Sequence, residues 1–223
     1  SARPIPGPFT DAFAEVARRH DVWILAGSLA ETSSDPGRPY NTSVLIAPDG
    51  RIAATYRKVH LFDVAVDAGP VDVESARVTA GSVPVCADID GVRVGLTVCY
   101  DLRFPELYRI LAVRGARIFT VPSAFTTPTG RAHWEVLLRA RAIENACFVL
   151  AANQVGPSPP HHDSWGHSMI VDPWGRVLAE APDEECFVAA ELDLTEQDRV
   201  RGSLPALANR RADAYRWPEG APV

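Results

Sequence analysis

Residues 95–107 read GLTVCYDLRFPEL, and this stretch decides the fold class that the sequence predicts. Residues 96–98 are strand-forming and end on Cys99, whereas Pro105 opens a segment with helical spacing. A thiol at the corner between a strand and a helix meets positive potential and backbone N–H groups, which favour the thiolate and a developing oxyanion. Cys99 is therefore a candidate nucleophile, and a small buried structural cysteine is the alternative that this stretch leaves open.

Strand signals rich in valine, isoleucine, phenylalanine and threonine recur along the chain. They lie near 23–27 and at 40–48, 51–58, 92–99, 116–123, 147–154, 167–173, 176–181 and 186–194. Asp49-Gly50 and Asp90-Gly91 predict tight hairpins, and 173–175 predicts a longer one, so part of the sheet is expected to be antiparallel. Residues 155–164, VGPSPPHHDS, are expected to form a loop.

Three segments, 10–19, 105–114 and 131–146, have apolar residues at helical spacing. The residues expected on their buried faces are Phe9, Phe13, Val16 and Ala17, then Leu107, Ile110 and Leu111, then Trp134, Leu137, Leu138 and Ala142. Hairpins combined with helix crossovers predict an α/β domain whose helices pack on sheet faces. At 223 residues and 47% hydrophobic content, we expect one globular domain.

Composition excludes several classes of protein. The net charge is −6 and there is no block of basic residues, so nucleic acid is not an expected partner. No window approaches eighteen consecutive apolar residues, so no membrane helix is expected. The four cysteines are widely separated, which argues against a zinc site and fits a reduced cytoplasmic setting. The three besides Cys99, namely Cys86, Cys147 and Cys186, are expected to fill core.

Lys58 is the second candidate. It ends a strand-like segment in TYRKVHLFD (55–63) and precedes the apolar residues Val59, Leu61 and Phe62. Lysine is normally a solvated surface residue. A partly buried ammonium that reaches Cys99 would stabilise both the thiolate and an anionic tetrahedral intermediate.

Five motifs in order resemble signatures of the nitrilase, or carbon–nitrogen hydrolase, superfamily, and specifically its Nit branch. They are YRKVHLFD (56–63), GLTVCYDLRFPEL (95–107), PSAF (122–125), GRAHWEVLLRARAIEN (130–145) and GHSMIVDPWGRV (166–177). The resemblance covers essentially the whole chain and is greatest to the deamidated-glutathione amidases. It implies one carbon–nitrogen hydrolase domain over 1–223, folded as a four-layer α-β-β-α sandwich with mixed sheets.

The resemblance also implies a catalytic set of glutamate, lysine and cysteine, usually with a second glutamate. Cys99 matches the nucleophile and Lys58 matches the lysine. Glu74, sixteen residues after Lys58 in VDVES, matches the second glutamate, with an exposed loop acid as its alternative.

One element of the family pattern is not found in these residues. The family's general-base glutamate lies in a Pro-Glu element at the end of an N-terminal strand, upstream of the segment PIPGPFTDAF (4–13). Neither Glu15 nor Glu31 is expected to inherit its role. We therefore expect an incomplete domain that lacks its N-terminal strand-helix-strand segment, with an uncovered sheet edge or apolar face beside 23–27. A catalytically silent binding or assembly module is the alternative if that glutamate is truly absent.

The resemblance implies a thiol amidase that works through a Cys99 acyl-enzyme and releases ammonia or an amine, without a cofactor and as a homo-oligomer. Its expected substrate is a small carboxylate-bearing amide such as deamidated glutathione, with ω-amides of α-keto dicarboxylates as the alternative. Arg103 is the expected partner of the substrate carboxylate, unless it pairs with Asp101 or Glu106 instead. Tyr100 and Phe125 are expected to contact substrate, although Phe125 is nearly as compatible with a core role.

Two competing kinds of site are disfavoured. His161, His162 and His167 are close in sequence, but two adjacent histidines in a proline-rich loop do not easily converge on one ion, so no metal is expected. A Cys–His pair that uses His60 or His133 is possible, but the lysine makes it superfluous.

Overall fold

The computed structural model describes residues 2–65, 71–158 and 162–215. One sheet has three antiparallel strands in the order β1-β2-β3. These strands are β1 (Ile24–Glu31), β2 (Tyr40–Ile46) and β3 (Ile52–Arg57). Along its other edge, β1 receives only the Arg3–Glu31 bridge from the described residues. The expectation that the domain lacks an N-terminal strand-helix-strand segment stays a prediction.

The second sheet has six strands in the order β13-β12-β9-β8-β7-β6. They are β6 (Val85–Ile89), β7 (Val92–Leu96), β8 (Ile118–Thr120), β9 (Phe148–Ala151), β12 (Met169–Val171) and β13 (Val177–Glu180). The central strands β7, β8 and β9 are parallel, and the outer pairings are antiparallel. The sheet is therefore mixed, as predicted.

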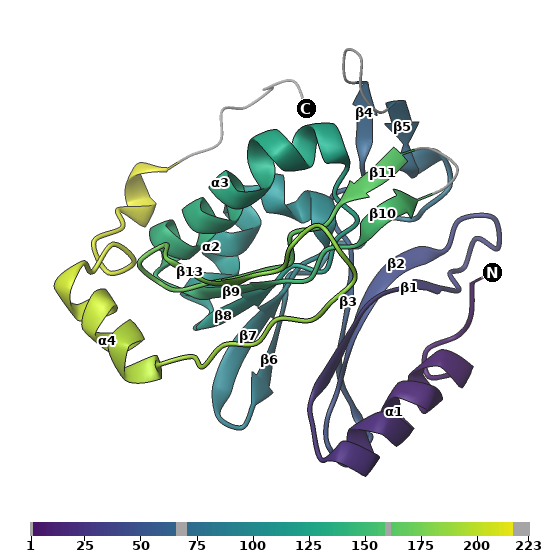
Figure 1. Ribbon diagram of the computed structural model, residues 1–223, viewed down its shortest axis with the longest axis horizontal. Coiled ribbons are helices and arrows are strands. Elements are labelled where there is room, and N and C mark those ends of the chain that lie inside the picture. The colour runs from purple at the N-terminus through teal and green to yellow at the C-terminus, as the bar shows by residue number, and fades with distance from the viewer. Residues whose placement is uncertain (1, 66–70, 159–161, 216–223) are drawn as a thin grey trace.

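Helices cover the outer face of each sheet (Figure 1). Helix α1 (Pro8–His20) contacts β1 and β2, whereas α2 (Pro105–Val113) contacts β7 and α3 (Thr127–Asn145) contacts β9 and β12. The inner faces of the two sheets meet in one core, where Tyr56 packs with residues of β7, β8 and β9. The predicted α-β-β-α sandwich is confirmed. Among the described residues, no helix is long and apolar enough to cross a membrane.

The predicted buried faces of two helices were partly wrong. Phe9 is 50% exposed and Val16 is 41% exposed, because α1 lies on β2 through the small residues Ala14 and Ala17. In α2 the residues Leu107, Tyr108, Leu111 and Ala112 form the buried stripe. Ile110 lies outside this stripe and is 42% exposed.

The three predicted hairpins are present, at β2–β3, β6–β7 and β12–β13. Asp90 and Gly91 both have positive φ angles, 48° and 82°, as a two-residue turn between twisted strands requires. The predicted loop at 155–164 is instead largely a hairpin of β10 (Val155–Ser158) and β11 (His162–Trp165). Another short hairpin joins β4 (Asp63–Ala65) to β5 (Val71–Val73).

The predicted strand at 186–194 does not form. Residues 186–193 belong to no sheet, since no strand of the described chain pairs with them, and Phe187 is 90% exposed. Helix α4 (Leu194–Ser203), which the sequence analysis missed, starts there, with the Asp193 side chain capping its first turn. Cys186 is exposed, so its predicted core role was wrong, whereas Cys147 is buried and Cys86 is half-buried.

Candidate active site

A cavity of about 220 Å³ opens where the parallel strands end, and its lining residues follow β7, β8 and β9 on one side. In a sheet with parallel strands, ligands bind outside the carboxyl ends of those strands. On the other side the cavity is lined from the three-stranded sheet and the segments that follow it. Five of the six predicted site residues line this cavity: Lys58, Glu74, Cys99, Tyr100 and Phe125.

Cys99 begins a short 3-10 helix, η2 (Cys99–Arg103), and has a left-handed φ of 49°. A non-glycine residue in this conformation costs on the order of 1–3 kcal/mol, and such residues cluster at functional sites. Its own N–H donates to Pro122 O at 2.9 Å, which ties the turn to the end of β8. The helix terminus at Cys99 is thus that of η2, because α2 starts only at Pro105. The Cys99 N–H is occupied by its bond to Pro122 O, so the first N–H of this turn that is placed to donate to an oxyanion is that of Tyr100.

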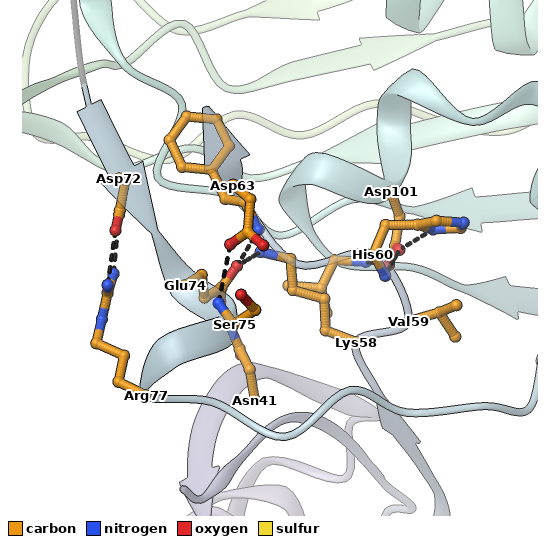
Figure 2. A network of polar contacts seen from close by, with 12 residues as sticks. Asn41, Lys58, Val59, His60, Asp63, Asp72, Glu74, Ser75, Arg77 and Asp101 are labelled. Atoms are coloured by element: carbon orange, nitrogen blue, oxygen red, sulfur yellow. Dashed lines mark hydrogen bonds and ion pairs between the residues drawn. The ribbon is translucent and has the colours of Figure 1, made fainter. Parts of the chain in front are cut away.

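Lys58 and Glu74 form a buried ion pair (Figure 2). Lys58 Nζ lies 2.6 Å from Glu74 Oε2, and the two side chains are only 3% and 9% exposed. Phe62 N–H donates to the same oxygen at 2.6 Å, and Asn41 Nδ2 lies 3.4 Å from Oε1. The carboxylate therefore fixes the ammonium at the cavity wall, and the alternative of an exposed loop acid for Glu74 is wrong.

Arg103 is not among the described residues that line the cavity. Its guanidinium lies 5.2 Å from the ring centroid of Phe125 and 5.8 Å from that of Tyr100. Burial lowers the pKa of Arg103 from its ordinary value. It contacts His133 Nδ1 at 3.4 Å, and none of the described carboxylates pairs with it, including those of Asp101 and Glu106.

The aromatic residues Phe125 and Tyr100 have mixed roles. Phe125 is 4% exposed and its ring lies 5.1 Å from that of Trp134, so it belongs both to the core and to the cavity wall. Tyr100 meets Phe62 and Phe104 edge-on, with ring centroids 5.1 Å and 5.5 Å away. These contacts make one side of the cavity rigid and apolar.

The sequence analysis missed a second charged pair at the cavity. Arg77 donates from Nη1 to Asp72 Oδ1 at 2.6 Å and from Nη2 to Asp72 Oδ2 at 2.8 Å, and both residues line the cavity. These hydrogen bonds raise the pKa of Arg77. The sequence held one signal of this pair: Arg77 follows the candidate Glu74 by three residues. In the structure it comes directly after the 3-10 helix η1 (Glu74–Ala76).

Neither histidine that the sequence offered as a partner for Cys99 lies in the described cavity lining. His60 bonds to Asp101, and His133 is exposed; neither is among the described residues of the cavity lining. Over the described part of the chain, no group of three or more histidine, cysteine, aspartate or glutamate residues could hold a metal ion. His167 Nδ1 lies 2.8 Å from Glu180, and His161 falls outside the described residues.

Comparison with known proteins matches the whole of this architecture. A family model described as carbon-nitrogen hydrolase matches residues 1–201. The chain is 45% identical over 205 residues to the deaminated glutathione amidase of Synechocystis sp. (strain PCC 6803 / GT-S), covering 90% of this chain and 75% of that protein. It is 40% identical over 214 residues to omega-amidase NIT2 of Homo sapiens, covering 96% of this chain and 77% of that protein.

The Caenorhabditis elegans nitrilase and fragile histidine triad fusion protein NitFhit is 44% identical over 211 residues. Its crystal structure superposes with a TM-score of 0.84 and covers 93% of this chain. This chain corresponds to 48% of the fusion protein, so it spans about half of that relative's length.

Proposed function

The chain belongs to the carbon–nitrogen hydrolase family, and we propose that the whole protein hydrolyses the amide bond of a small carboxylate-bearing amide through an acyl-enzyme on Cys99. The observation that carries the proposal is the buried Lys58–Glu74 pair, which lines the same cavity as the strained Cys99. A buried ammonium beside a thiol suits the stabilisation of a thiolate and of an oxyanion.

In the first half-reaction, Cys99 Sγ attacks the amide carbonyl carbon. The carbonyl oxygen takes up negative charge, and Lys58 Nζ and Tyr100 N–H donate to it. The carbonyl re-forms as the carbon–nitrogen bond breaks, and the nitrogen takes up the proton that the Cys99 thiol lost and leaves as ammonia or an amine. A thioester remains on Cys99. Water attacks this thioester in the second half-reaction, which yields the carboxylic acid and the free thiol.

Glu74 acts by holding Lys58. Its Oε2 already accepts from Lys58 Nζ and from Phe62 N–H, so it is poorly placed to take a further proton from Cys99 or from water. Both half-reactions need a general base. The family resemblance assigns that role to a glutamate upstream of the segment 4–13, which is why the activity must be measured on the full-length protein.

The substrate class follows from the cations near the cavity. Arg103 is a half-buried guanidinium beside the aromatic wall, and a carboxylate that reached it would satisfy it. The relatives named as a deaminated glutathione amidase and as an omega-amidase support a carboxylate-bearing amide. Deaminated glutathione is the preferred substrate of the proposal, and ω-amides of α-keto dicarboxylates are the alternative.

We also propose that the protein acts as a cytoplasmic homo-oligomer. Helices α2 and α3 carry apolar side chains that are 42% to 67% exposed, namely Ile110, Val113, Val136 and Ile143. Since α2 and α3 contact each other, these side chains are candidate contacts of a subunit interface. The four cysteines are free thiols, as expected in a reducing compartment.

The experiment measures hydrolysis by the full-length protein of a panel of deaminated glutathione, α-keto ω-amides, neutral aliphatic amides and nitriles. The amine released is detected for deaminated glutathione, whose amides are peptide bonds, and ammonia is detected for the other compounds. We expect turnover of a carboxylate-bearing amide and its loss in Cys99→Ala. Full-length protein that binds these amides but turns over none of them would favour the silent binding module instead.

A further inference from the structure

Asp101 is a fully buried carboxylate two residues after Cys99, and it does not line the cavity. Its Oδ2 accepts Val98 N–H at 2.9 Å, and Asp101 N–H donates to Val98 O at 3.1 Å. These two bonds close a ring around Cys99, the residue with the left-handed backbone. Asp101 therefore stabilises the conformation that presents the thiol.

The same carboxylate reaches the segment that carries Lys58. Tyr56 OH donates to Oδ2 at 2.7 Å, and Oδ1 accepts His60 N–H at 3.1 Å and lies 2.7 Å from His60 Nδ1. Tyr56 and His60 are the residues two before and two after Lys58. Figure 2 shows the contacts of Asp101 with His60 and the contact of Lys58 with Glu74. Asp101 thus holds the segment on both sides of the lysine.

These contacts are more than the turn itself needs. Val98 N–H alone would close the turn, and a carboxylate buried in the core is costly unless it is fully hydrogen-bonded. Burial and the charge of Asp101 raise the pKa of Tyr56, so Tyr56 stays a neutral donor. The His60 ring also stacks on Phe104 with ring centroids 3.6 Å apart. The lysine segment is therefore fixed to η2 through one carboxylate and one stacked ring.

We propose that Asp101 is a positioning residue that sets the Cys99 thiol relative to the Lys58 ammonium. The inference rests on the proposed function of this site. Without the hydrogen bonds of Asp101, the Cys99 thiol and the Lys58 ammonium are both still present, but they are no longer held at the distance and orientation that the reaction needs. A misplacement of about 1 Å at a catalytic centre costs on the order of 100-fold in rate. Because Asp101 does not touch the cavity, its loss acts on turnover and not on substrate affinity.

The test is Asp101→Asn in the full-length protein, in a Cys186→Ser background that removes the exposed thiol. Asparagine keeps the shape, but its amide group opposes the donors of either His60 or Val98. We expect kcat to fall by about 100-fold with KM within about threefold, and Cys99 alkylation by iodoacetamide to slow at least about tenfold. Asp101→Asn with kcat and alkylation within about threefold of the parent would overturn the proposal.

Asp172→Asn is the matched control. Asp172 is also a buried acid that accepts backbone N–H groups, from Trp174 at 2.9 Å and Arg176 at 2.8 Å, but it is not among the described lining residues. It should lower the melting temperature with kcat unchanged. An equal fall of kcat in the two variants would show that loss of stability explains the effect and would overturn the proposal.

Tyr56→Phe decides the question if Asp101→Asn does not fold. It removes one bond from the lysine segment and leaves the Asp101–Val98 turn intact. We expect kcat and the alkylation rate to fall together by about tenfold, and unchanged values of both would overturn the proposal. The alkylation readout needs no amide substrate, so it separates this inference from the proposed function.

Discussion

The Glu74 carboxylate lies 2.6 Å from the Lys58 ammonium, and solvent reaches almost none of either side chain. Such a pair gains its stability only while both charges are present, because each charge loses its hydration in the folded protein. The pair therefore contributes both to the stability of the fold and to turnover. Mutations of Glu74 and Lys58 separate these two contributions.

Glu74→Gln should lower turnover without unfolding the protein. Glutamine keeps the shape but offers Lys58 and Phe62 N–H a weaker, neutral acceptor, so the ammonium is no longer fixed. We expect kcat/KM to fall by about 100-fold. Steady-state kinetics and circular dichroism check this together. Full activity in Glu74→Gln would remove Glu74 from the site.

Lys58→Met should destabilise the fold by about 3–5 kcal/mol, because it leaves the Glu74 charge buried and unpaired. The double variant Lys58→Met with Glu74→Gln should recover much of this loss while staying inactive. Urea denaturation of the two single variants and the double variant measures the coupling. Additive losses would show that the two residues do not act as a pair.

Arg103→Leu should erase most of the preference for carboxylate-bearing amides over neutral amides of similar length. A buried charge-assisted contact is worth about 2–5 kcal/mol, or roughly 30- to 5,000-fold in kcat/KM. Alkylation of Cys99 by a small neutral reagent should stay nearly unchanged. Equal kcat/KM for both substrate classes in the parent enzyme would show that Arg103 is structural.

Arg77→Leu tests whether Arg77, and not Arg103, binds the substrate carboxylate, since Arg77 is among the described lining residues of the cavity and Arg103 is not. Asp72 already satisfies two of its N–H groups, so we expect a smaller loss of preference than in Arg103→Leu. Arg93→Leu is the matched control, because Arg93 is held by Asp88 in a similar way and is not among the described lining residues. A larger loss in Arg77→Leu would transfer the carboxylate role to Arg77.

Glu31→Gln should lower stability only above mildly acidic pH. Burial raises the pKa of Glu31, but hydrogen bonds from Arg57 and Thr42 outweigh it and hold the pKa below its usual 4.5. A depressed pKa contributes stability that is present above 4.5 and is lost as the pH falls through the folded-state value. We expect a loss of about 1.5–3 kcal/mol at pH 7 in urea denaturation, which shrinks as the pH drops below 4.5. A loss independent of pH would contradict this.

Local patterns predicted much of the site. A strand that ends on Cys99 and a lysine followed by apolar residues are both signals in the sequence itself. Glu74 came only from the family resemblance, because nothing local distinguishes it from a loop acid. Its contact with Lys58 depends on how η1 folds back on the segment after β3.

Contacts between residues far apart in the chain could not be predicted from local sequence patterns. The role of Asp101 depends on donors up to 45 positions away in the chain, such as Tyr56. Arg103 was expected in the cavity, but it ends the 3-10 turn η2, lies 5.2 Å from the ring centroid of Phe125 and is not among the described lining residues. The 186–194 segment has the composition of a strand, and composition does not reveal whether a neighbouring strand is there to pair with it.

The most direct test of the account is trapping of the acyl-enzyme. Full-length protein is mixed with deaminated glutathione, quenched within one turnover, digested and analysed by mass spectrometry. We expect one acyl group on the peptide that contains Cys99, a burst of released amine equal to the enzyme concentration, and neither in Cys99→Ala. Amine release that persists in Cys99→Ala, or an adduct confined to Cys186, would contradict the assignment of Cys99 as the nucleophile.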